Sequence, residues 1–110
     1  MTKILQTIVL TVALVGAAIA QPADRQLVRE QLPEYPSLLK KMGIGGTVKL
    51  SAIVAADGTV KKTKIDGGNP MLGEIACGAV KKWKYAPASQ PSNEIVEMTF
   101  DAKTAGVRVK

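Results

Sequence analysis

The sequence contains no histidine and only one cysteine, Cys77, among its 110 residues. Most transition-metal sites in proteins are assembled from these two residue types, so we expect neither a metal nor any other cofactor. A lone cysteine cannot form an intramolecular disulfide, and we expect Cys77 to pack as a small apolar residue, the alternative being an intermolecular disulfide. Nucleophilic catalysis needs an oriented base beside the nucleophile, and the sequence shows no such combination. These absences predict a protein that is not an enzyme.

A long apolar run occupies the N-terminus, from Ile4 to Ala20, preceded by Lys3 and ending in small residues. This pattern is typical of a signal peptide, here residues 1–20. The alternative is an uncleaved membrane segment, because about 20 apolar residues can span a bilayer. We expect a short linker or helix over residues 21–32, one domain over residues 33–103 and a tail over residues 104–110.

Acidic residues are fewer than basic ones, 9 against 15, which gives a formal net charge of +6. The basic runs 61–64 and 81–84 raise nucleic-acid or polyanion binding as a second hypothesis. We expect no nucleic-acid partner, because an exported protein seldom meets nucleic acid. The run 81–84 also has a simpler explanation, since it falls at the predicted C-terminus of a helix, where positive charge is favourable.

Alternating apolar and polar residues predict strands over residues 47–56 and 94–101, with a less regular strand over residues 59–67. The dipeptide Asp57-Gly58 lies between the predicted strands 47–56 and 59–67 and is typical of a two-residue hairpin turn. The tail 105–110 either extends the sheet or frays.

Three helices are expected around these strands. Residues 24–32 form a short helix, and a second runs from Pro36 to about Met42. The third begins after Asn69-Pro70 and reaches about Lys84, with Trp83 on its apolar stripe.

Several short motifs occur in this order: Pro33-x-Tyr35-Pro36, Gly46-x-Val48, Asp57-Gly58-x-Val60, and the run from Ala79 to Pro87 that contains Lys81-Lys82-Trp83-Lys84-Tyr85. Together they resemble the C-terminal domain of the TonB energy-transducer family, over about Pro33 to Asp101. The resemblance implies an α+β fold with two helices packed on one face of a three-stranded antiparallel sheet. It also implies a set of structural positions: Tyr35, Pro36, Asp57, Gly58, Trp83, Tyr85 and Pro87.

In that family the domain binds the TonB box, an extended segment of outer-membrane TonB-dependent transporters, by adding it as a strand at a sheet edge. The resemblance implies a periplasmic location, or an inner-membrane anchor through residues 4–20. It further implies a transporter as partner, with an inner-membrane complex or a second copy of the chain as additional partners. The strand that matches the peptide-binding one comprises Glu94, Ile95, Val96, Glu97, Met98, Thr99 and Phe100.

The transducers of the family carry a long proline-rich spacer before this domain. Here about a dozen residues separate Ala20 from Pro33, which reach roughly 40 Å when extended. The run Ile4 to Ala20 also has no ionisable residue through which it would couple to a proton-driven motor. An alternative is therefore a stand-alone periplasmic interaction module, or a self-associating one, without an energy-transducing role.

Overall fold

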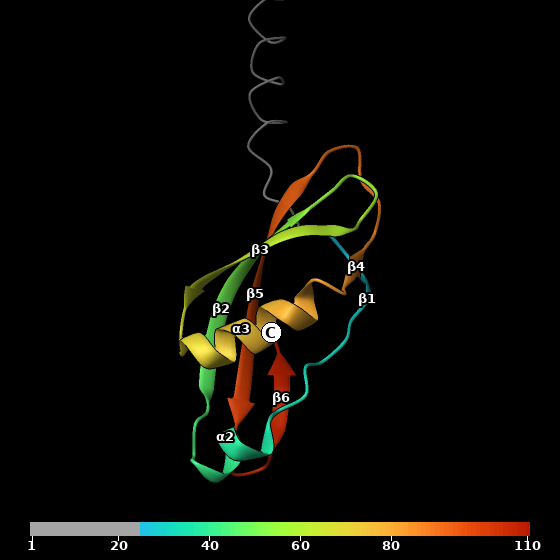
Figure 1. The fold of residues 1–110 in the computed structure, drawn as a ribbon. Coiled ribbons are helices and arrows are strands. Elements are labelled where there is room, and N and C mark those ends of the chain that lie inside the picture. The colour runs from blue at the N-terminus through green and yellow to red at the C-terminus, as the bar shows by residue number, and fades with distance from the viewer. Residues whose placement is uncertain (1–24) are drawn as a thin grey trace, which may run out of the picture.

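The structure is a computed structural model that describes residues 25–110, so the predicted leader and the first residues of the linker lie outside the described part. Figure 1 shows how the elements are arranged. In chain order they are β1 (Leu27–Arg29), α2 (Ser37–Lys41), β2 (Gly46–Val54), β3 (Val60–Gly67), α3 (Pro70–Val80), β4 (Lys84–Tyr85), β5 (Ser92–Asp101) and β6 (Gly106–Val109).

The main sheet is antiparallel and has four strands in the order β3-β2-β5-β6. The three predicted strands are confirmed, and the three-stranded expectation is corrected by β6, which extends the sheet from the tail. A tight turn makes this return possible. In it the Asp101 side chain accepts a hydrogen bond from the Lys103 amide at 3.0 Å, and Ala105 adopts a φ of 61°.

The centre of the sheet is the pairing of β2 with β5, which runs without a register shift from Gly46 opposite Phe100 to Val54 opposite Ser92. Because side chains alternate across a strand, each of these two strands sends every second residue into the core. The buried residues of β2 are Val48, Leu50, Ala52 and Val54, and those of β5 are Glu94, Val96, Met98 and Phe100. The opposite face of the sheet is open, and Ile53 and Ile95 are exposed on it.

The β2–β3 connection differs from the predicted two-residue turn. The Gly58 amide donates to the Ala55 carbonyl at 2.9 Å, and the Ala55 amide donates to the Thr59 carbonyl at 2.8 Å. Gly58 has a φ of 96°, whereas Asp57 is not among the described residues with positive φ. A turn of ordinary hand followed by one left-handed glycine replaces the predicted turn, in which both central residues would need positive φ. Asp57 instead accepts hydrogen bonds from the Thr59 amide and hydroxyl.

The helix α3 lies across the inner face of the sheet (Figure 1). Its predicted start is confirmed, because the Asn69 side chain accepts hydrogen bonds from the amides of Met71 and Leu72. Its predicted end near Lys84 is wrong, since the helix stops at Val80 and tightens there through a bond from the Trp83 amide to the Val80 carbonyl. Trp83 is therefore a core residue that follows the helix rather than a member of its stripe.

The predicted helix over residues 24–32 is also wrong for the residues that the structure describes. Leu27 to Arg29 form β1, which pairs antiparallel with β4. The Gln26 carbonyl accepts from the Ala86 amide at 2.8 Å, and the Gln31 carbonyl accepts from the Trp83 indole at 2.8 Å. Contacts distant in sequence thus outweigh the local preference of a polar, leucine-containing segment. By contrast, the predicted helix near residues 36–42 is confirmed as α2, with Pro36 preceding its first residue.

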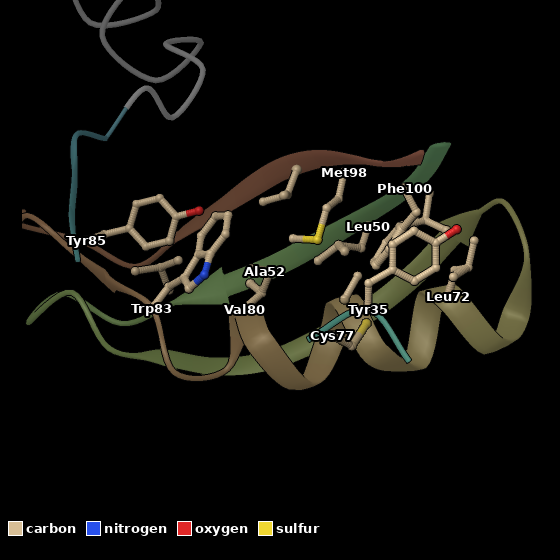
Figure 2. Close-up of a cluster of buried hydrophobic side chains, with 14 of the residues drawn as sticks. Tyr35, Leu50, Ala52, Leu72, Cys77, Val80, Trp83, Tyr85, Met98 and Phe100 are labelled. Atoms are coloured by element: carbon tan, nitrogen blue, oxygen red, sulfur yellow. The ribbon is translucent and has the colours of Figure 1, made fainter. Parts of the chain in front are cut away.

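The core lies between the sheet and α3 (Figure 2). Tyr35 and Phe100 pack edge to face at one end, with ring centroids 5.3 Å apart. Trp83 and Tyr85 lie together at the other end. Cys77 is a free, buried cysteine of this core, so its predicted apolar packing is confirmed.

Gly58 is the position at which we expect a single methyl group to be most costly. Besides the left-handed backbone, a Cβ at this residue would overlap the Tyr85 carbonyl. We predict that Gly58→Ala lowers the free energy of unfolding by about 2 kcal/mol or more, as measured by urea denaturation. Gly78→Ala is the matched control, because this helical glycine has open space around it. It should raise stability by about 0.5–1 kcal/mol, and equal effects of the two substitutions would contradict the account of the turn.

Candidate functional site: the outer edge of β5

The sheet has two outer edges, formed by β3 on one side and by β5 with β6 on the other. On the second side β6 covers only the C-terminal half of β5, from Met98 opposite Val109 to Asp101 opposite Gly106. The last contact is a bond from the Lys110 amide to the Glu97 carbonyl at 2.9 Å. Before Glu97, the outer edge of β5 pairs with no strand of residues 25–110.

The pairing of β5 with its neighbours determines which backbone N–H and C=O groups point outward from its open half. The bond between Lys110 and Glu97 shows that the backbone polar groups of Glu97 point away from β2. In an antiparallel strand this direction alternates from residue to residue, so the N–H and C=O groups of Asn93 and Ile95 point the same way. These groups lie on a strand held in register by β2, which makes them a ready template for another strand.

The predicted peptide-binding residues all lie on β5, but they divide into two sets. The side chains of Glu94, Val96, Met98 and Phe100 are buried in the core. Those of Ile95, Glu97 and Thr99 lie on the other face, where Ile95 is 56% exposed and the Thr99 hydroxyl is 2.8 Å from that of Thr47. An added strand would therefore meet the second set and the backbone.

Several of the predicted structural residues lie outside the β5 edge and fix the backbone around the sheet through hydrogen bonds. The Tyr35 hydroxyl donates to the Ile44 carbonyl at 2.5 Å and anchors the chain just before β2. Tyr85 pairs with Leu27 in the small sheet, and its amide donates to the Gly58 carbonyl. Pro87 lies between Ala86 and Ala88, and the Ala88 amide donates to the Ala56 carbonyl. The contacts of the Tyr85 and Ala88 amides hold the β2–β3 hairpin against the segment that leads into β5, whereas Tyr35 acts at the opposite end of β2.

Sequence reasoning missed Arg25, whose guanidinium joins three segments at this end of the sheet. It donates to the Ala86 carbonyl at 2.7 and 3.0 Å, to the Ala55 carbonyl at 2.9 Å and to the Ala56 carbonyl at 3.0 Å. A further bond of 3.3 Å reaches the Ser92 hydroxyl, at the first residue of β5. An arginine in a polar segment gives no sequence signal for such a role, because its partners are backbone carbonyls.

Glu94 is the buried charged residue of this region, with 7% of its surface exposed. One carboxylate oxygen accepts from the Arg25 amide at 3.4 Å, whereas Oε2 has no hydrogen-bond partner among the described residues. Burial raises the pKa of the nearby Tyr85 phenol to about 12, and the negative charges of Glu94 and Glu30 act in the same direction.

Within residues 25–110, no three or more histidine, cysteine or acidic residues come together as a metal site would require. None of the helices in that part of the chain has the length and apolar character needed to cross a membrane.

Comparisons with known proteins agree with the fold. Residues 31–104 match the family described as the Gram-negative bacterial TonB protein C-terminal. The protein tonB2 of Pseudomonas aeruginosa is 37% identical over 70 residues, which are 62% of this chain and 26% of that protein. The chain thus spans about a quarter of that relative's length. The solution structure of the Pseudomonas aeruginosa TonB CTD superposes with a TM-score of 0.54 at 21% identity, covering 69% of this chain and 86% of that one.

The buried environment of Tyr85 predicts a pH dependence of stability. Because the folded state holds the phenol pKa near 12, above its ordinary value of about 10, the neutral phenol stabilises the folded state below pH ~10. This contribution is lost as the pH rises towards 12. We expect Tyr85→Phe to lose less stability than the parent protein between pH 9.5 and 12, in urea titrations at each pH. Parallel profiles for the two proteins would contradict this assignment, since lysine titration affects both equally.

Proposed function

The chain belongs to the family of C-terminal domains of Gram-negative bacterial TonB proteins, and from this premise we propose that it binds an extended peptide segment by strand addition at the outer edge of β5. Domains of this family are interaction domains rather than enzymes. The proposed peptide is the TonB box of an outer-membrane TonB-dependent transporter, bound in the periplasm. The role that follows is in energy-coupled transport across the outer membrane, with an inner-membrane complex as a further partner.

The observation that carries this proposal is the unpaired half of the edge between Ser92 and Glu97. Outward N–H and C=O groups at Asn93 and Ile95 supply hydrogen bonds that depend little on the peptide's side chains. The exposed side chain of Ile95 adds an apolar contact on the open face. Such an edge suits a family of related peptides.

The strand β6 limits how far a peptide extends along β5. A strand paired only before Glu97 would lie end to end with β6. Pairing along the whole of Glu94 to Phe100 requires the peptide to take the place of β6, which occupies Met98 to Asp101. The four residues of β6 form a short pairing, so the exchange is open to an extended competitor.

The opposite edge, formed by β3, is less suited to strand addition. Lys61, Lys62 and Lys64 are exposed along it, and the β2–β3 register shifts near both ends. Charged residues and bulges are devices by which edge strands resist pairing. The two edges of the sheet are thus unequal, and the β5 side is the one available.

Self-association is a second candidate for the same edge. Two copies of β5 could pair antiparallel, because the outward groups of Asn93 and Ile95 recur every second residue and would face their own symmetry mates. Sedimentation velocity separates this from peptide capture, since a dimer forms without any peptide.

Proline at Ile95 tests the proposed edge. It removes an outward N–H without removing a β2 bond, whereas Met98, whose backbone faces β2, is unsuitable for this test. We predict that Ile95→Pro weakens binding of TonB-box peptides at least tenfold in NMR titrations. Ile95→Thr, which keeps the N–H, should retain affinity within a few-fold. A folded Ile95→Pro protein that binds as tightly as the threonine variant would rule out strand addition at this residue.

Removal of β6 tests the exchange. We predict that a chain ending at Thr104 binds the same peptides several-fold more tightly than the parent, because no strand then competes for Met98 to Asp101. Affinity that is unchanged by the truncation would mean that the peptide pairs only before Glu97.

A further inference from the structure

A basic cleft lies at the end of the molecule where α3 ends and β4 begins. It has a volume of about 430 Å³ and is bounded by β1, the turn after α3, β4 and the start of β3. Its lining residues are Arg29, Thr59, Val60, Lys81, Lys82, Trp83 and Lys84. Four of these carry positive charge and none carries negative charge.

The convergence of these cations is a product of the fold rather than of one basic run. Lys81, Lys82 and Lys84 are close in sequence, but Arg29 is brought to them by the pairing of β1 with β4, in which it lies opposite Lys84. Like charges on directly opposed residues of two strands repel each other. The C-terminal dipole of α3 offsets only about half a charge, so the cleft retains an excess of positive potential.

Asp57 is an acidic residue that interacts with this group of cations, and its carboxylate is already engaged in hydrogen bonds. Asp57 accepts hydrogen bonds from the Thr59 amide at 3.0 Å and from its hydroxyl at 2.7 Å. These bonds, together with the charges of Lys84 and Lys61, hold the pKa of Asp57 below its usual value. Its single charge balances at most one of the four cations.

The floor of the cleft is fixed, which distinguishes it from a set of mobile surface lysines. Trp83 is 3% exposed, and its indole N–H donates to the Gln31 carbonyl at 2.8 Å. An isolated bridge between Thr59 and Lys84 joins the start of β3 to β4 at the other wall. The backbones that carry Arg29, Lys82 and Lys84 therefore stay in one arrangement.

From this arrangement we infer that the cleft is a binding site for a phosphate-bearing ligand. An arginine fork pairs with two phosphate oxygens at once, and lysine ammonium groups add point charges around the same anion. A volume of about 430 Å³ accommodates a phosphate or diphosphate group with part of the body attached to it. The ligand is either a soluble phosphate compound or the headgroup of an anionic phospholipid.

The test uses ¹⁵N-labelled protein purified with the N-terminus that it has in cells. Inorganic pyrophosphate should give saturable shifts of the Arg29, Lys82 and Lys84 amides and of the Trp83 indole. The double variant Arg29→Gln/Lys82→Gln should weaken binding at least fivefold. The control Lys41→Gln/Lys103→Gln removes the same charge from exposed residues outside the cleft and should change affinity less than twofold.

Two outcomes would overturn the proposal. One is a set of shifts that does not saturate, and the other is an equal loss of affinity in both double variants, which would reflect net charge alone. Sedimentation with phosphatidylglycerol and phosphatidylcholine vesicles then separates the sources. If the protein binds selectively to the phosphatidylglycerol vesicles and the cleft variant does not, the ligand is a lipid headgroup. If the protein binds pyrophosphate saturably but does not bind these vesicles, the ligand is a soluble phosphate compound.

Discussion

The unbroken pairing of β2 with β5 sets the positions of the core, of α3 and of the open sheet edge. Nine residue pairs in one register bring two sets of alternating apolar side chains to the same face, where α3 covers them. A slip of β5 by one residue against β2 would turn Val96 and Met98 to solvent and bring Ile95 and Glu97 into the core. Because burial fixes the register so firmly, the outer edge of β5 presents its backbone groups in a defined order, and strand addition needs that order.

The hairpin end of the sheet is held by polar contacts rather than by the apolar core. Arg25 gathers carbonyls from the β2–β3 connection and the segment before β5, while the β1–β4 pairing brings the N-terminal segment alongside. The same pairing sets Arg29 beside the lysines that follow α3. One short ladder thus supports both the fixed start of β5 and the basic cleft, two surfaces that share none of their lining residues.

Much of this fold follows from local patterns in the sequence. Alternation located β2 and β5, and the Asn69-Pro70 pair located the start of α3, since each signal acts over a few residues. The wrong expectations concern segments whose partners are distant. Residues 27–29 pair with β4 across more than 50 positions, and Trp83 leaves the helical path to donate to Gln31. Val107 and Val109 alternate with polar residues in the tail, which is compatible with a strand. The pairing of this strand with β5 depends on the turn at residues 102–105. The strand that carries the candidate site could be predicted; the half of its edge that stays open could not.

The proposed function places a peptide on β5, on the side away from β2. Amide hydrogen exchange, measured by NMR with and without a saturating TonB-box peptide, distinguishes this placement from binding elsewhere on the domain. Strand addition should strongly protect the amides of Asn93 and Ile95 in the complex, while those of Glu94 and Val96, which already face β2, change little. New protection confined to β3, or to the cleft beside α3, with Ile95 exchanging as before, would contradict it.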